Sequence, residues 1–244
     1  MQNISEITLC GLLFGMLGTT LGGIIGSFLN IKSCKKLGFI LEFAAGLMTS
    51  IICFDLIPEA LEYTDITVCL IGIFIGIIIM ILCDEFVNKI TIKEHKNNNL
   101  LKTGMIILIG LTLHNFPEGL AIGAGFEASS SLGISLAIAI AIHDVPEGIS
   151  IAVPLKEGGN KKGKVIFLTS MSGITTGIGA FFGVIIGYIS EVLIGGALAL
   201  AAGAMLYIVS CELIPESKSL YKGRFTSFGN IVGILLGLFA HVCF

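Results

Sequence analysis

The hexapeptide HNFPEG, residues 114–119, recurs as HDVPEG at residues 143–148. Each copy lies inside a long apolar run, where a histidine, a carboxylate and a proline all carry an energetic cost. In each copy the histidine and the glutamate are four residues apart, so an α-helix places them on one face. The two motifs therefore predict neighbouring helices that direct similar polar side chains toward one point.

The rest of the sequence has the composition of an integral membrane protein. Of the 244 residues, 55% are hydrophobic and only 13% are charged, whereas a soluble domain carries about twice that charged fraction. The mean hydropathy is +0.98. Eight apolar stretches are near or above the ~20 residues that a helix needs to cross a bilayer. They cover residues 6–30, 38–60, 66–88, 103–126, 131–155, 164–189, 193–214 and 226–244.

Leu, Ile, Gly and Ala dominate these stretches without an alternating pattern, which favours helices over a β-barrel. We therefore predict an all-α integral membrane protein with eight transmembrane helices, forming a single transmembrane domain over residues 1–244.

The basic residues predict the orientation. All 14 Lys and Arg lie in the connections after the first, third, fifth and seventh stretches. By the positive-inside rule, these four connections are cytoplasmic and both termini are extracytoplasmic. The chain has no positively charged region before its first apolar run, so we interpret that run as a span rather than a signal peptide. We expect a multi-pass protein of the plasma or inner cell membrane.

An internal repeat relates the two ends of the chain. AAGLMTSIICFDLIPEA, from Ala44, aligns without gaps on AAGAMLYIVSCELIPES, from Ala201, at an offset of 157 residues. Residues 1–88 thus form a first repeat and residues 164–244 a second, around a central hairpin at 103–155. Equivalent spans are an odd number of spans apart and cross the membrane in opposite directions, which is the inverted repeat of many secondary transporters.

The repeat also pairs four acidic residues near the two membrane surfaces. Asp55 and Glu59 are expected toward the outer mouth, and Glu212 and Glu216 toward the inner mouth. Carboxylates inside spans are costly unless they serve a function. We expect these four residues to line an access pathway for a cation, although Glu59 and Glu216 are also explained as helix ends in the headgroup region.

The central motifs supply the ligands for that cation. Pro117 and Pro146 lack an N–H and free the carbonyls of Leu113 and Ile142. Two imidazoles, carboxylates and an amide suit a borderline divalent cation such as Zn²⁺, Fe²⁺, Mn²⁺ or Cd²⁺, and suit Na⁺ or K⁺ poorly. The candidate metal ligands are His114, Asn115, Glu118, His143, Asp144 and Glu147.

Together with FDLIPEA and CELIPES, these motifs resemble those of the ZIP (Zrt/Irt-like) metal transporters, and in particular their bacterial GufA-like branch. The resemblance implies uptake of divalent metals into the cytoplasm through a binuclear site, and pairing of two chains as a homodimer. It implies one metal position at His114, Glu118, His143 and Glu147. A second would use Asn115 and Asp144, with Glu118 and Glu147 shared.

One position departs from the family pattern. The sixth span of the family commonly reads SG-x-x-EP, with a metal-ligating glutamate. Here it reads SGITTGIGA, from Ser172, so Thr176 occupies that place. A neutral hydroxyl is a weaker ligand than a carboxylate, and we expect a weaker second metal position with Thr176 as a weak contact.

Metal transport is the leading interpretation, with zinc as substrate, no organic cofactor and no enzymatic activity. A proton-coupled carrier of an organic solute, with the carboxylates as relays, is an alternative. An intramembrane metalloenzyme is another, although the sequence holds no H-E-x-x-H motif. The expected partners are divalent cations, the lipid bilayer and a second copy of the chain, and not nucleic acid.

Overall fold

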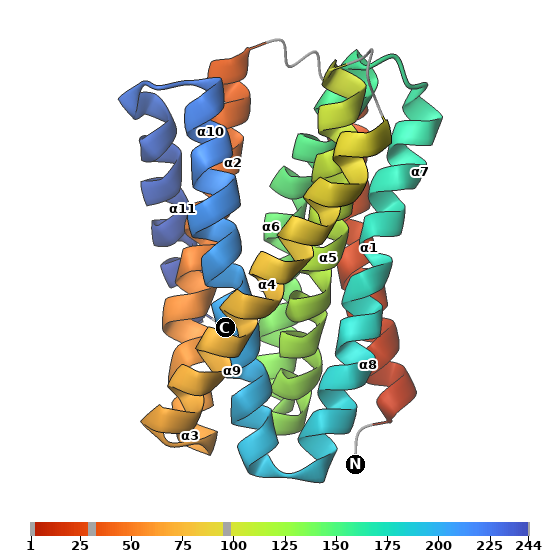
Figure 1. Cartoon of the computed structure of the whole chain (residues 1–244). Coiled ribbons are helices and arrows are strands. Elements are labelled where there is room, and N and C mark those ends of the chain that lie inside the picture. Colours follow the sequence, from red (N-terminus) through yellow and green to blue (C-terminus); the bar gives the residue numbers. More distant parts are fainter. Residues whose placement is uncertain (1–2, 29–32, 95–98, 244) are drawn as a thin grey trace.

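Helices make up nearly all of the structure (Figure 1). The computed structural model describes residues 3–28, 33–94 and 99–243, and no strand occurs in these ranges. The α-helices are α1 (Ile4–Phe28), α2 (Cys34–Ser50), α3 (Ile57–Tyr63), α4 (Ile66–Glu94), α5 (Asn99–Ala128), α6 (Ser130–Glu157), α7 (Lys162–Ser172), α8 (Ile174–Ile189), α9 (Glu191–Tyr207), α10 (Ile214–Leu220) and α11 (Arg224–Cys243). Two π-helical segments, η1 (Ile51–Leu56) and η2 (Ile208–Leu213), join α2 to α3 and α9 to α10.

The helices agree with a multi-pass membrane protein. Seven helical stretches of the described chain are long and apolar enough to cross a membrane, and α5, at 30 residues, provides the remaining predicted span. Several helices extend beyond the predicted bounds: the second span, predicted at 38–60, covers Cys34–Tyr63. Residues 29, 30 and 244 of the predicted spans lie outside the described residues.

The second and seventh spans each contain a π-helical turn that the apolar pattern did not predict. In each, the turn ends just before the proline of the LIPE motif, Pro58 or Pro215. A proline has no N–H to continue the α-helical hydrogen bonds. The N–H of the preceding residue, Ile57, donates to the carbonyl of Ile52, five residues back instead of the four of an α-helix. Asp55 and Glu212 lie within these wide turns.

The sixth span, predicted as one helix over 164–189, is interrupted at Gly173, between α7 and α8. Gly173 packs against α1 so closely that a Cβ atom would lie 2.6 Å from the carbonyl oxygen of Gly15. The interruption leaves the Ser172 carbonyl to accept hydrogen bonds from side chains, including the hydroxyl of Thr175 at 2.8 Å. The apolar pattern continues through this break, so periodicity alone could not find it.

The helices form two groups. Helices α1, α5, α6, α7 and α8 pack on one another, and we call them the motif-bearing bundle because α5 and α6 carry HNFPEG and HDVPEG. Helices α2, α3, α4, α9, α10 and α11 form the flanking bundle. The two bundles meet where α5 lies against α9 and α6 against α2 (Figure 1).

The structure repeats at the same offset as the sequence. The bounds of α2, η1 and α3 each differ by 157 residues from those of α9, η2 and α10. In Figure 1, the chain runs downward from α2 to α3 and upward from α9 to α10. Glycines allow equivalent close crossings: Gly148 of α6 packs on Gly22 of α1, and Gly119 of α5 on Gly179 of α8.

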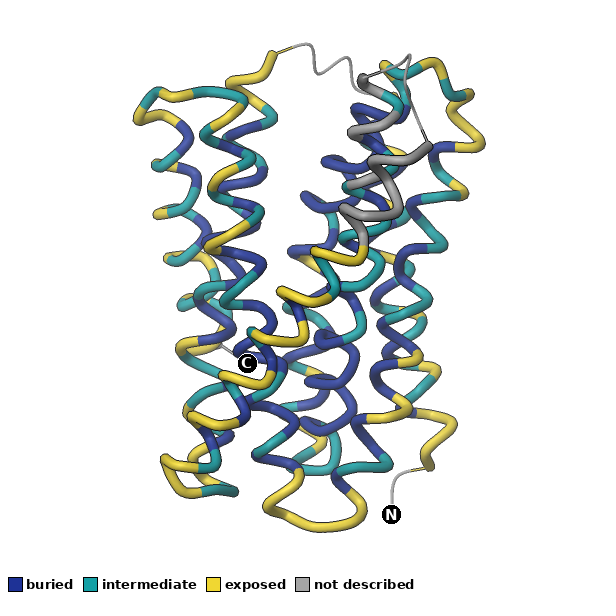
Figure 2. Tube along the Cα trace, in the orientation of Figure 1, coloured by how far each residue is buried: buried dark blue, intermediate teal, exposed yellow. Residues whose placement is uncertain are grey.

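The described helix ends beside the Lys- and Arg-bearing connections lie at one end of the molecule, at the top of Figure 1, where α2 and α5 begin and where α6 leads to α7 and α10 to α11. We call this the lysine-rich end; the N-terminus lies at the opposite end. Buried residues concentrate in the middle of the molecule, around α5 and α6, while α4 and α11 are largely exposed (Figure 2). Exposed apolar side chains such as Phe74 and Leu82 of α4 suit a surface that faces lipid.

Candidate metal centre

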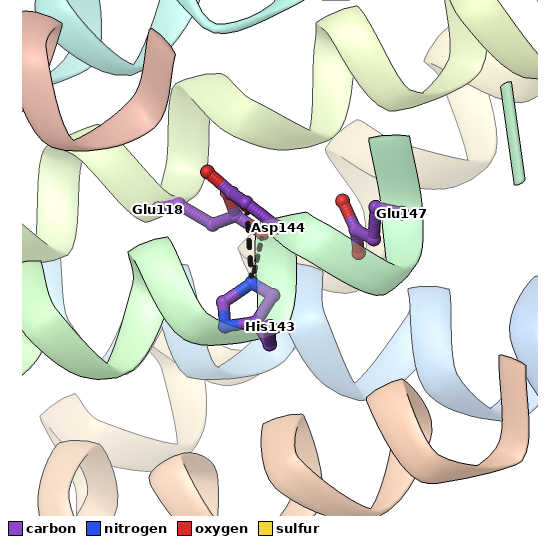
Figure 3. Close-up of side chains that lie close together, drawn as sticks. All are labelled: Glu118, His143, Asp144 and Glu147. Carbon is purple, nitrogen blue, oxygen red and sulfur yellow. Dashed lines mark hydrogen bonds and ion pairs between the residues drawn. The ribbon is translucent and has the colours of Figure 1, made fainter. Parts of the chain in front are cut away.

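Helices α5 and α6 bring four of the predicted ligands into one buried cluster (Figure 3). Glu118 comes from α5, while His143, Asp144 and Glu147 come from one turn of α6. Each residue offers one ligand atom, and these four atoms all lie within 4.8 Å of one another. All four side chains are buried. We call these four residues the quartet. Its members from α6 converge because positions i, i+1 and i+4 of a helix share one side.

Contacts inside the quartet leave most of its oxygens without a partner. The Nε2 atom of His143 lies 3.0 Å from Oε1 of Glu118 and 3.6 Å from Oδ1 of Asp144. Oε2 of Glu118 and both oxygens of Asp144 and of Glu147 have no hydrogen-bond partner among the described residues. Burying an uncompensated carboxylate costs several kcal/mol at least. Three carboxylates and one imidazole therefore form a donor set that a divalent cation would stabilise.

His114 is buried on α5, one turn before Glu118, but it is not part of the quartet. Its Nε2 atom lies 3.1 Å from Oε2 of Glu212 in η2. The contact crosses from the motif-bearing to the flanking bundle. His114 thus links the quartet's helix to Glu212, which was predicted to line the inner pathway.

His114 and Glu212 line a cavity of about 740 Å³. Its wall includes Cys34 at the start of α2, Glu157 at the end of α6, and Glu216 and Ser219 of α10. Because these helix ends lie at the lysine-rich end, the cavity extends from that end to His114. The predicted pathway residues Glu212 and Glu216 therefore both lie along it.

Asp55 and Glu59 are absent from the lining of this cavity. They belong to η1 and α3, which run toward the opposite end (Figure 1). Oδ1 of Asp55 lies 2.8 Å from Nδ1 of His241 in the last turn of α11. The structure thus separates the four predicted pathway residues into two pairs, one at each end.

Asn115 and Thr176 each present one buried oxygen that has no hydrogen-bond partner within the described part of the chain. The amide of Asn115 donates to the freed carbonyl of Ser172 at 3.0 Å, which leaves its Oδ1 atom available. Thr176 is fully buried, and its side chain packs against Gly15 of α1. Neither residue belongs to the quartet.

Sequence reasoning missed polar residues around the cavity. Asp84 of α4 lies in the cavity wall and accepts a hydrogen bond from the Tyr207 hydroxyl at 3.1 Å. The repeat offered a signal, because the position of Asp84 in the first repeat corresponds to that of His241 in the second. Asp84 contacts the span that contains η2, and His241 contacts the span that contains η1. Each of these π-helical turns carries an acidic residue. A search for polar residues at equivalent positions would have found both.

Comparisons with known proteins agree with these features. The family model described as ZIP Zinc transporter matches residues 93–243. Zinc transporter ZupT of Stenotrophomonas maltophilia (strain R551-3) is 31% identical over 237 residues, which cover 89% of this chain and 88% of that protein. Zinc transporter GufA of Myxococcus xanthus is 36% identical over 166 residues, which cover 67% of this chain and 65% of GufA. The chain thus belongs to the ZIP zinc transporter family.

Proposed function

We propose that the protein carries divalent transition-metal cations, zinc foremost and also iron, manganese and cadmium, across the membrane into the cytoplasm. The observation that carries the proposal is the quartet, with five carboxylate oxygens that lack hydrogen-bond partners among the described residues. Relatives named zinc transporters support the transport of a divalent metal. The same names argue against the metalloenzyme interpretation, and the chain is not an enzyme.

The proposed pathway runs from the quartet through His114 to the cavity. A cation held by Glu118, His143, Asp144 and Glu147 passes to His114 and Glu212, which are 3.1 Å apart. It then follows the wall past Glu216 to the lysine-rich end, which is cytoplasmic by the positive-inside rule. Asp55 and Glu59 take the equivalent role at the outer mouth, and both termini are extracytoplasmic.

A second metal position would use the free oxygens of Asn115 and Asp144, with Glu118 and Glu147 shared. Thr176 contributes at most a weak contact, because a neutral hydroxyl attracts a cation less than a carboxylate does. The pairing of two chains as a homodimer stays a prediction from the family resemblance.

The decisive experiment measures metal flux in liposomes. The purified protein is reconstituted, and an internal dye reports the arrival of Zn²⁺ or Cd²⁺. Glu118→Gln and Glu147→Gln should each reduce the rate more than about tenfold, since each removes a charged ligand at nearly constant size. Glu62→Gln, at an exposed position of α3, is the matched control and should keep the wild-type rate. Wild-type flux in both quartet variants would refute the proposed site.

A further inference from the structure

The quartet is buried, and the cavity that reaches His114 is lined by residues toward the lysine-rich end, whereas Tyr63, Ala128 and Ile194 at the opposite end do not line it. The cavity extends from the lysine-rich end to His114. At the opposite end, which we call the closed end, α3 packs on the start of α9 and hydrogen-bonds to the end of α5. A protein with two inverted repeats can exchange which end is open, so the contacts that close this opposite end determine the state observed here.

A hydrogen bond joins the two bundles at the closed end. The hydroxyl of Tyr63, the last residue of α3, donates to the carbonyl oxygen of Ala128 at 3.2 Å. Ala128 is the last residue of α5, and its carbonyl is among those that a helix leaves without an intrahelical partner. The bond therefore connects the flanking bundle directly to the helix that carries Glu118.

The surrounding packing fixes the position of Tyr63. Gly195 of α9 approaches it so closely that an added Cβ atom would lie 3.0 Å from Cβ of Tyr63 and 2.8 Å from the Ala60 carbonyl oxygen. A larger residue than glycine at this position would displace α3. The tyrosine is thus held by its own bundle, while its hydroxyl reaches the other one.

The equivalent position of the second repeat lacks the group that forms this link. The position equivalent to Tyr63 in the second repeat, at the offset of 157 residues, is Leu220. Leu220 is the last residue of α10 and lines the open cavity. Its side chain has no hydrogen-bonding group, so the bond that Tyr63 makes at the closed end has no counterpart at the open end.

We propose that the Tyr63 hydroxyl is a latch that holds the end opposite the cavity closed and biases the metal-free protein toward the state open at the lysine-rich end. Exchange between the two states would serve the transport proposed above, but the bias itself exists without metal. A hydrogen bond of ordinary net strength changes such an equilibrium by about 2- to 12-fold. Tyr63→Phe should increase the population open at the latch end by this factor.

The test measures the reactivity of a buried thiol at the latch end in metal-free protein in detergent. Ile194 of α9 is 4% exposed and lies between the bundles, because a Cβ on Gly187 of α8 would be 3.2 Å from it and 2.7 Å from Glu127 of α5. Ile194→Cys, with the natural cysteines replaced, reacts with a maleimide only when this end opens. Tyr63→Phe should raise its reaction rate about 2- to 12-fold.

Two controls separate the latch from general loosening. Tyr188→Phe removes a hydroxyl from a side chain that is 63% exposed and should leave the rate unchanged. A second reporter, Val165→Cys, lies buried within the motif-bearing bundle and should stay unreactive in Tyr63→Phe. An unchanged rate at Ile194→Cys, or an equal rise at both reporters, would overturn the latch. Because no metal is present, neither result bears on the transport proposal.

Discussion

At the scale of single residues, identical side chains acquire different roles from their surroundings. His114 and His143 open the two copies of one motif, yet His143 contacts Glu118 inside the quartet and His114 contacts Glu212 at the cavity. The difference arises because α5 and α6 run antiparallel and meet different neighbours. His143 is therefore the imidazole of the buried site, and His114 connects that site to the cavity.

Alanine substitution should distinguish the two histidines. His143→Ala removes a nitrogen ligand from the quartet and should weaken Zn²⁺ binding more than about tenfold, or about 1.4 kcal/mol. His114→Ala should weaken binding less, while it slows release into the cavity. Titration calorimetry in detergent measures both affinities. A larger loss of affinity in His114→Ala than in His143→Ala would place the resting metal site at the cavity instead.

Metal affinity should also depend on pH. A bound cation requires a neutral imidazole and ionised carboxylates, so protons compete with it for the same atoms. Lowering the pH favours the protonated ligands and should weaken binding, most steeply below about pH 6, where a histidine of ordinary pKa takes up its proton. Calorimetry at pH 5 and pH 7.5 tests this. Equal affinities would show that protonation of His143 and the carboxylates does not limit binding.

At the scale of helices, glycine determines how closely the site-bearing elements approach. Gly179 of α8 packs on the backbone of α5, and an added Cβ atom would overlap the carbonyl oxygen of Phe116, within HNFPEG. Gly22 of α1 makes the equivalent approach to the carbonyl of Val145, within HDVPEG. These crossings hold both motifs at fixed positions. The glycines thus position the proposed metal site from outside the quartet.

Two glycine substitutions with the same chemistry should therefore have opposite effects. Gly179→Ala forces α8 away from α5 and should lower thermal stability and Zn²⁺ affinity together. Gly196→Ala in α9 enters open space and should be neutral or stabilising, because alanine favours a helix by up to about 1 kcal/mol over glycine. Thermal unfolding in detergent compares the two. Equal melting temperatures would mean that the α5–α8 crossing can relax without cost.

An ion pair joins α2 to α10, two helices that line the cavity. Glu42 of α2 is nearly fully buried, and its carboxylate lies 2.8 Å from Nζ of Lys218 in α10. Lys218 also donates to Ser227 of α11 at 2.6 Å. Three helices of the flanking bundle are thereby joined, and Lys218 follows the proposed pathway residue Glu216 by two positions in α10.

Removing the two partners of this pair should have unequal costs. Lys218→Met leaves the Glu42 carboxylate buried without compensation and should destabilise the protein by about 1–3 kcal/mol. Glu42→Gln should cost less, since the Lys218 side chain is 38% exposed and can turn to solvent. Equilibrium unfolding of the two variants and of the double variant measures the coupling. A greater loss in Glu42→Gln would contradict this account.

At the scale of the whole molecule, the proposed metal binding should be coupled to folding stability. A cation that binds only the folded quartet stabilises the protein, by about 2.7 kcal/mol at a concentration 100-fold above its dissociation constant. Zn²⁺ should therefore raise the melting temperature of the wild type and have little effect on Glu118→Gln. Mg²⁺, a hard cation that prefers oxygen ligands alone, is the control. No shift with Zn²⁺ would favour the alternative of an organic solute carrier.

The sequence by itself determined much of this protein. The hydropathy and the placement of Lys and Arg indicated eight helical spans, because both depend only on the residues of each segment. The internal match indicated the repeat, because the matching residues are separated by a constant 157 positions. The paired motifs named six candidate ligands, and four of them form the quartet, since helical spacing places His143, Asp144 and Glu147 on one side of α6.

Only the tertiary structure decided which partners meet across helices. It separated His114 from the quartet and brought it to Glu212, interrupted the sixth span at Gly173, and joined Tyr63 to Ala128. These features depend on contacts between residues far apart in the chain. The hydropathy of each segment does not change when such contacts form, so it cannot reveal them. The physical reason is that glycine contacts and freed carbonyls determine where helices cross. The residues that meet at such a crossing cannot be identified from their positions along the chain.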